Sequence, residues 1–214
     1  MANIATINGI AEDNISHHNG GTAALYTSKN GDTWQHTTWT AATGGDSITT
    51  SGDYKIHRFH SSGTFAVSAI GTDTSVHFLV VASGAGGGGS MGAGGGAGGL
   101  RTSFTTSEGT SGGGGTYESA GTLAVADYAI VLGAGGAGGT DRANGANGGS
   151  VSSLIGTNIS ISTVVGGGGG YHVTGASSSA GTAGGSGGGG GSTSSGRART
   201  SNEGYAGGNG GGGD

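Results

Sequence analysis

Residues 78–99 read Phe78-Leu-Val-Val-Ala-Ser-Gly-Ala-Gly-Gly-Gly-Gly-Ser-Met-Gly-Ala-Gly-Gly-Gly-Ala-Gly-Gly99, an apolar run that passes directly into glycine. The same junction recurs where Val131-Leu132 enters residues 133–139 and where Val164-Val165 enters residues 166–170. Short apolar runs rich in β-branched residues are typical of strands. A flexible glycine/serine linker needs no hydrophobic residues at its entrances. The junctions therefore favour ordered glycine tracts anchored on β-strands.

Ordering polyglycine requires a specific physical cause. Glycine loses more backbone entropy on folding than any other residue, so a glycine tract stays disordered unless its backbone groups find partners. Extended left-handed helices with three residues per turn offer such partners, because chains without Cβ atoms pack close enough to pair N–H with C=O. The chain has no proline and no strict Gly-X-Y register, which excludes a collagen triple helix.

Glycine is concentrated in one part of the 214-residue chain. Nine of its 57 glycines lie in residues 1–83 and the other 48 in residues 84–214. Charged residues make up 9% and aromatic residues 6%, so an ordinary side-chain core cannot extend over the whole length. We expect residues 1–47 to form an attachment and oligomerisation segment and residues 48–214 to form a glycine-rich β/polyglycine domain.

The first segment contains a regular turn signal. Asn-Gly pairs recur at Asn8-Gly9, Asn19-Gly20 and Asn30-Gly31, and Asn-Gly is the strongest short-range signal for a hairpin. The sequence predicts small hairpins that are too thin to fold alone, with a flexible leader as the alternative. Trp34 and Trp39 follow the third turn, where we expect them to attach the segment to a partner; a core role is the alternative.

Strands are predicted in the remainder of the chain by runs of apolar and β-branched residues. The third run, residues 76–82, is nearly continuous in apolar character, and we expect it to be buried on both faces. The predicted strands span residues 54–60, 64–68, 76–82, 123–132 and 159–165. The expected fold class is mainly β with polyglycine-II-like layers, a short N-terminal hairpin segment and few or no helices.

Several function classes are disfavoured. The net charge of −5 is spread without basic runs, which argues against a nucleic-acid partner, and no apolar run is long enough for membrane insertion. The N-terminus has no signal-peptide pattern. The chain has no cysteine, no P-loop and no pairing of a nucleophile with a base, so we expect no enzyme activity, cofactor or metal. His57 and His60 point to opposite faces of a strand, which disfavours shared metal ligation.

The residues resemble a known family. The stretch Ile48-Thr-Thr-Ser-Gly-Asp-Tyr-Lys-Ile-His-Arg-Phe-His-Ser-Ser-Gly-Thr-Phe-Ala-Val67, followed by Phe78-Leu-Val-Val-Ala-Ser-Gly-Ala-Gly-Gly-Gly-Gly89, is similar to the glycine-rich domain of tailed-phage virion proteins. Residues 128–139 and 164–170 match its continuation. Architecturally, the chain resembles the tip adhesins of T-even-like phages, although it places β-strands before and between its glycine tracts.

This resemblance implies a non-enzymatic virion protein made in the host cytoplasm and carried on the tail or capsid surface. We expect a tail fibre or receptor-binding adhesin, attached to other virion proteins through residues 1–47 and assembled as a homo-oligomer such as a trimer. Its receptor would be a host surface glycan or an outer-membrane protein. The alternatives are a head decoration or other surface protein without a receptor role and, more remotely, an ice-binding glycine helix bundle.

The adhesin interpretation places recognition on polar segments between glycine tracts, because loops on a rigid scaffold carry function. Aromatic rings stack on sugar faces, and arginine pairs with acidic groups. The alternative is that these residues are simply exposed or anchor the packing of the tracts. The candidate receptor-binding residues are Arg101, Tyr117, Arg142, Tyr171, His172, Arg197, Arg199 and Tyr205.

Overall fold

The structure is a computed structural model of the full chain. Contacts divide it into two compact units, residues 1–39 with 71–73 and residues 40–70 with 74–214. The fold is mainly β, and the described residues contain no helix. The described residues are 6–7, 10–11, 17–18, 21–22, 28–29, 32–33, 38–52, 54–104, 110–111, 115–149, 151–163, 165–170 and 179–211.

The first unit contains three two-stranded antiparallel hairpins. In each hairpin the innermost paired residues are separated by one of the three Asn-Gly pairs, as in Ile7↔Ile10. The predicted Asn-Gly hairpins are therefore confirmed. The strands are β1 (Thr6–Ile7), β2 (Ile10–Ala11), β3 (His17–His18), β4 (Gly21–Thr22), β5 (Ser28–Lys29) and β6 (Asp32–Thr33).

The second unit begins with a five-stranded antiparallel sheet in the order β19-β18-β17-β10-β7. The central pair, β10 and β17, aligns Phe65 with Tyr128. Sequence-distant strands thus pair at the centre, while β18 and β19 form a local hairpin. The strands are β7 (Ala41–Thr43), β10 (Gly63–Ala69), β17 (Ala126–Val131), β18 (Ser152–Gly156) and β19 (Ile159–Thr163).

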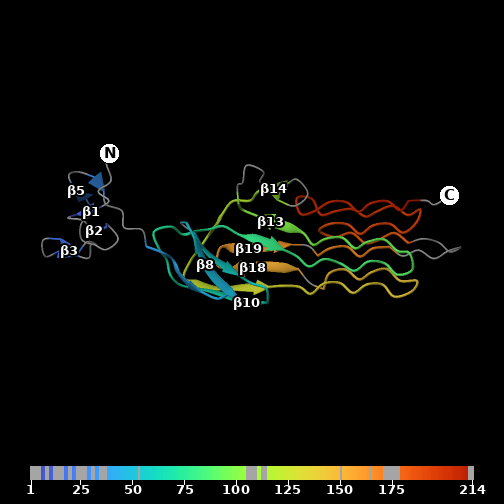
Figure 1. Ribbon diagram of the computed structural model, residues 1–214, viewed down its shortest axis with the longest axis horizontal. Helices are drawn as coiled ribbons and strands as arrows, with labels where there is room; N and C mark the ends of the chain where they lie inside the picture. Colours follow the sequence, from blue (N-terminus) through green and yellow to red (C-terminus); the bar gives the residue numbers. More distant parts are fainter. Residues whose placement is uncertain are drawn as a thin grey trace. The chain divides into compact units, whose positions relative to one another are not determined.

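Four smaller antiparallel ladders accompany this sheet: β8 with β9, β11 with β16, β12 with β13, and β14 with β15. Figure 1 shows the labelled strands gathered at one end of this unit, with long wavy segments extending from them. The strands are β8 (Ser47–Ser51), β9 (Tyr54–Arg58), β11 (Ser75–Val76), β12 (Leu79–Val81), β13 (Leu100–Thr102), β14 (Thr110–Ser111), β15 (Gly115–Thr116) and β16 (Gly121–Thr122).

A small side-chain core lies between the large sheet and the segments that cover one of its faces. Tyr128 is fully buried, and its ring lies 6.0 Å from that of Phe65. The Tyr128 hydroxyl accepts a hydrogen bond from the backbone N–H of Ala124 at 2.8 Å, so the buried phenol keeps a polar partner. The other members of the core cluster are Ala42, Val67, Phe78, Leu123, Leu154, Ile159 and Ile161.

The predicted strand at residues 76–82 is wrong in one respect. The segment forms two short strands, β11 and β12, and it is not buried on both faces: Leu79 is 60% exposed and Val81 49% exposed. Val80 between them packs against the core. The physical reason is that β12 covers the sheet as an outer layer and the described residues form no third layer beyond it, so alternate side chains point outward.

The glycine-rich segments form ordered, extended tracts joined by backbone hydrogen bonds. Tract 165–170 is the best enclosed, since residues 166–170 are all buried. Figure 1 shows these segments as wavy lines running side by side away from the sheet. In the described part of the chain, the glycine tracts span residues 83–89, 92–99, 133–140, 143–149, 165–170, 179–183, 184–191, 194–200 and 204–211.

Hydrogen bonds between the tracts repeat every three residues. Gly166 and Gly169 donate to the carbonyls of Ser83 and Gly86, each at 3.0 Å, in tract 83–89. The next position turns to another neighbour, because Gly167 and Gly170 donate to Ser186 and Gly189 at 3.0 and 2.9 Å. A chain whose bonds rotate among neighbours with period three is a polyglycine-II-type helix. The expected polyglycine layers are therefore present.

The close spacing explains why these tracts consist of glycine. A Cβ atom added at Gly167 would collide with the carbonyl of Thr182, and one added at Gly169 would collide with the carbonyl of Ala93. Both obstacles are backbone atoms, which have little freedom to move aside. Here main-chain pairing replaces side-chain packing as the source of cohesion.

Candidate functional site

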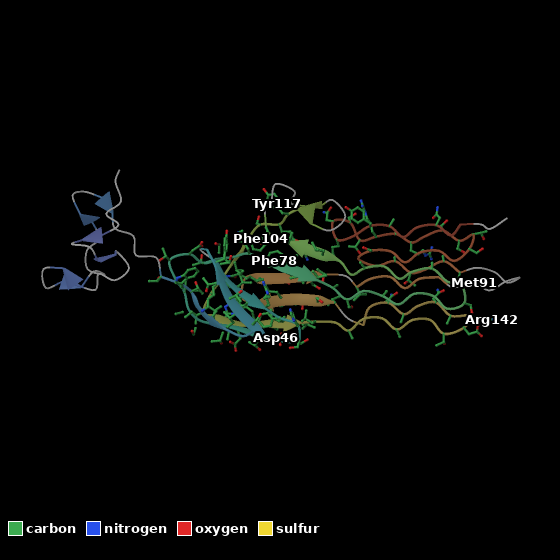
Figure 2. The ribbon with its side chains drawn as sticks, in the orientation of Figure 1. Asp46, Phe78, Met91, Phe104, Tyr117 and Arg142 are labelled. Atoms are coloured by element: carbon green, nitrogen blue, oxygen red, sulfur yellow. The ribbon has the colours of Figure 1, made fainter. Side chains whose placement is uncertain are left out.

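Successive tracts run in opposite directions, so the turns between them alternate between two ends of the bundle. Tract 165–170 pairs in parallel with tract 83–89 and antiparallel with tract 143–149. One end adjoins the sheet; the other, called the distal end, lies away from it. Figure 2 places Met91 and Arg142 at the distal end and Phe78 near the strands. The described distal turns are residues 89–91, 141–142 and 192–193.

Side chains occupy strained backbone positions in these distal turns. Ser90, Met91, Asp141 and Ser192 have positive φ values of 45°, 51°, 21° and 43°. A non-glycine residue in this region costs about 1 kcal/mol or more, whereas glycine adopts it freely. These turns therefore hold side chains at positions where glycine would adopt the same backbone without strain.

The positive-φ residues away from the distal end differ in type. Asn158 lies in the β18–β19 turn with φ 60°, and Asn202 lies at the sheet end of the bundle with φ 63°. Asparagine is the non-glycine residue that tolerates the left-handed region best. Among the described residues, serine, methionine and aspartate therefore adopt a strained positive φ in the distal turns and nowhere else.

A side-chain hydrogen bond joins two of the distal turns. The Ser90 hydroxyl donates to Asp141 Oδ1 at 2.9 Å, although 51 residues separate them in sequence. Beside this contact, Met91 is 69% exposed and Arg142 is exposed. The turns thus present a thioether, a carboxylate and a guanidinium on one joined surface, with the polar link limiting their relative motion.

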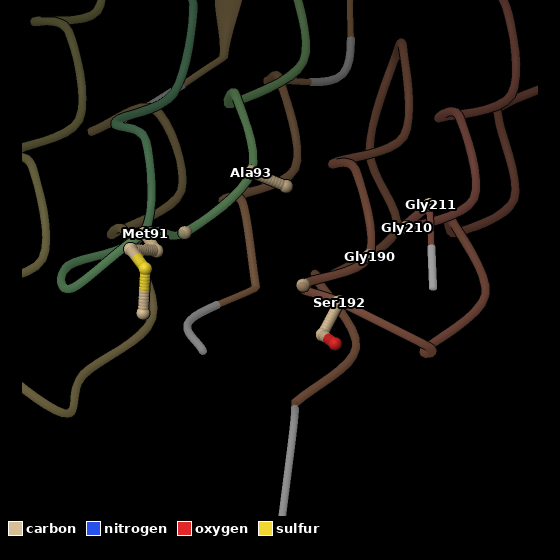
Figure 3. A pocket seen from close by; sticks show the side chains of 8 residues that line it. Met91, Ala93, Gly190, Ser192, Gly210 and Gly211 are labelled. Carbon is tan, nitrogen blue, oxygen red and sulfur yellow. The ribbon is translucent and has the colours of Figure 1, made fainter. Parts of the chain in front are cut away.

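A shallow cavity of about 380 Å³ opens at the same end. Figure 3 shows Met91 and Ser192 on opposite sides of it. No charged or aromatic side chain is among its described lining residues, so the cavity offers methyl and thioether contacts, one hydroxyl and glycine backbone. The lining residues are Met91, Gly92, Ala93, Gly190, Gly191, Ser192, Gly210 and Gly211.

Arg101, a predicted receptor-binding residue, is held in an internal network on β13. Its Nε and Nη2 donate to the two carboxylate oxygens of Glu118, each at 2.6 Å, and Nη1 donates to the carbonyl of Ser162 at 2.8 Å. The hydrogen bond with Glu118 raises the pKa of the Arg101 guanidinium above its usual value. Arg101 therefore joins β13 to the edge strand β19, with its fork fully engaged.

The remaining predicted receptor-binding residues are distributed over the whole second unit. Tyr117 is 49% exposed and lies near the strands in Figure 2. Arg197 lies within tract 194–200, where its Nε donates to Gly181 at 3.0 Å. Arg199 pairs with Gly184 in an isolated β-bridge, and Tyr205 follows the turn at the sheet end. The described members of the set therefore do not form a single surface.

Of these candidates, Arg142 lies in a distal turn. Tyr171, His172 and the proposed attachment residue Trp34 lie outside the described residues. Trp39 belongs to the first unit and is 53% exposed. Sequence reasoning missed Ser90 and Met91, although the Ser-Met pair interrupts a long glycine run and is itself a signal for a turn.

The described residues offer no second kind of site. They contain no group of three or more histidine, cysteine or acidic residues arranged to hold a metal ion. No helix among them has the length and apolar character needed to cross a membrane.

The geometry defines a class of protein in which an antiparallel β base supports a bundle of hydrogen-bonded glycine tracts. A family model described as a glycine-rich domain matches residues 60–214, and the chain belongs to this family. The glycine-rich part of the resemblance is thereby confirmed. No curated protein and no solved structure matches the chain.

Proposed function

We propose that the protein is a non-enzymatic virion structural protein of a tailed phage, acting as a tail fibre or receptor-binding adhesin. The observation that supports this function most is the set of strained side chains at the distal turns, where Ser90 and Asp141 hold two turns together. A rigid scaffold that presents fixed turns suits recognition, since little conformational entropy is lost on binding.

The recognition surface in this proposal is the distal end rather than the scattered set of aromatic and arginine residues. Met91 and Arg142 are exposed there, and the cavity beside Met91 accommodates an apolar group of the receptor. A host outer-membrane protein or surface glycan is the proposed partner. Residues 1–47 are proposed to attach the protein to other virion proteins.

Competition for host adsorption tests the receptor role. Purified protein is expected to reduce adsorption of the phage, and a Met91→Lys/Arg142→Glu variant is expected to lose most of that effect. Ala206→Lys is the matched control, because Ala206 is exposed on tract 204–211 away from the distal turns. If the wild-type protein is found on virions but does not compete, it is a decoration protein without a receptor role.

Deletion of residues 1–39 tests the attachment role separately, because β7 of the large sheet begins at Ala41 and must be kept. The truncated protein is expected to be absent from purified particles while the full chain is incorporated. Normal incorporation of the truncated protein would contradict attachment through this segment. Electron microscopy of labelled particles then locates the full chain on the tail or the capsid.

A further inference from the structure

Tract 133–140 lies at the rim of the glycine bundle. On its inner side, Gly136 and Gly139 donate to carbonyls of tract 83–89 at 2.9 and 2.8 Å. A Cβ atom at either position would collide with a backbone carbonyl of tract 143–149. Glycine is therefore required at these two positions because the neighbouring tract of the same molecule leaves no room for a side chain.

The outer side of this tract leaves its donors unpaired. Among the described residues, no hydrogen-bond partner exists for the N–H groups of Ala134, Gly135, Ala137 and Gly138, which are all exposed. In the enclosed tract 165–170, by contrast, every N–H from residue 166 to residue 170 donates a hydrogen bond. Tract 133–140 is therefore the polyglycine counterpart of an edge strand in a sheet.

Nothing within the chain requires glycine at positions 135 and 138. The nearest atoms to an added Cβ are the carbonyl oxygens of Gly84 and Gly87, each 3.8 Å away, which is ordinary contact. Neither residue has a positive φ. Glycine nevertheless carries a larger entropy cost than alanine, so its presence at both positions points to a requirement from outside the molecule.

The tract itself carries no charged side chain, and the exposed residues Asp141 and Arg142 follow it directly. From Tyr128 to Thr140 the sequence has no charged residue. Val131, the last residue of β17, is 40% exposed, and Ile155 on β18, which pairs with Ala129, is 45% exposed. Covering such an uncharged strip with another protein surface would remove apolar groups from water and give its free backbone N–H groups partners.

We propose that tract 133–140 is an interface at which a second copy of this chain packs side by side, backbone against backbone. The partner must approach as closely as the tracts approach each other inside the bundle, so it must lack Cβ atoms at every third position. This chain supplies that pattern itself, with donors and acceptors on the same rim. The proposal concerns association alone and holds whether or not the protein is carried on a virion.

The other open glycines differ from this pair in the side chains beside them. Gly94 has open space around it, but Ala97 stands one turn further along the same tract. Gly208 and Gly211 are also open and lie one turn apart, but Tyr205, which is 63% exposed, stands one turn before them. Gly135 and Gly138 are likewise one turn apart, and the residues one turn before and after them are the half-buried Leu132 and the exposed Asp141.

Sedimentation velocity of the full chain over a concentration series tests the proposal. The wild type is expected to self-associate reversibly. A Gly135→Ala/Gly138→Ala variant is expected to bind itself about tenfold more weakly or worse, since two methyl groups hold the backbones apart. A Gly94→Ala/Gly208→Ala variant makes the same chemical change elsewhere and is expected to associate like the wild type.

Two controls make the result decisive. Both variants must keep the far-ultraviolet circular dichroism of the wild type and a melting temperature no lower than that of the wild-type monomer, as the free space at all four positions predicts. Amide exchange at residues 134–138 of the wild type is expected to slow as concentration rises. A wild type that stays monomeric, or an equal loss of association in both variants, overturns the proposal.

Discussion

The side-chain oxygen of Asn147 accepts a hydrogen bond from the backbone N–H of Gly168 at 3.0 Å. The other N–H groups of residues 166–170 donate to backbone carbonyls of neighbouring tracts. An asparagine side chain thus takes the place of a missing backbone neighbour, and the hydroxyl of Thr182 donates to the same oxygen. Because uniform glycine tracts would pair equally well after a three-residue slip, this side-chain contact fixes their register.

Replacing Asn147 therefore tests how the register is specified. Asn147→Ala leaves the N–H of buried Gly168 without a partner and is expected to cost about 1–3 kcal/mol of unfolding free energy. Asn209→Ala is the matched control, because Asn209 accepts from Gly196 at 3.0 Å where water replaces it readily. Denaturant unfolding measures both, and equal losses would contradict a special role for Asn147.

Gly169→Ala tests backbone packing. The new methyl group would collide with the carbonyl of Ala93 inside the bundle, and we expect a loss of about 1–3 kcal/mol or more in unfolding free energy. Gly94→Ala has open space and is expected to be neutral or to stabilise by about 0.5 kcal/mol. Thermal unfolding of the two variants compares them. Similar melting temperatures would show that the tracts are not in close contact.

Arg101→Met separates a structural role from a receptor role. The substitution removes the ion pair with Glu118 and the hydrogen bond to Ser162, and because the pair is partly exposed we expect a loss of only about 1 kcal/mol. Binding to host cells should be retained. Arg142→Met should do the opposite, with stability kept and binding reduced. Loss of binding by a stably folded Arg101→Met protein would instead show that Arg101 takes part in recognition.

The carboxyl group of Asp46 gives the fold a pH dependence. Hydrogen bonds from the N–H of His60 at 2.5 Å and from the hydroxyl of Ser61 at 3.1 Å hold the pKa of Asp46 below its usual value. A lowered pKa in the folded state stabilises the protein above the ordinary aspartate pKa, and this contribution is lost as pH falls through the folded pKa.

Nuclear magnetic resonance titration of the Asp46 carboxyl measures this effect. The midpoint should lie below that of an aspartate in an unfolded peptide. Asp46→Asn should flatten the acid limb of stability against pH, since the amide cannot titrate. A midpoint at or above the peptide value would contradict the hydrogen bonds from His60 and Ser61.

Local signals predicted much of the secondary structure. The Asn-Gly pairs set the hairpins of the first unit, and the run around Tyr128 forms β17. These features depend on nearby residues, whose turn preferences and side-chain alternation are visible in one dimension. The exposure of Leu79 was not visible, because a continuous apolar run does not reveal how many layers cover it.

The sequence by itself determined that this chain is a β protein with ordered glycine tracts, since apolar strands enter the tracts directly and the absence of Cβ atoms permits backbone contact. Tertiary structure alone decided which polar segments share a surface. Tracts that alternate in direction send successive turns to opposite ends, so Met91 and Arg142 both lie at the distal end, whereas Arg101 lies on β13. Which tracts lie next to each other depends on hydrogen bonds between residues that are distant in sequence. Because the tracts have nearly the same glycine sequence, that sequence does not show which two of them pair.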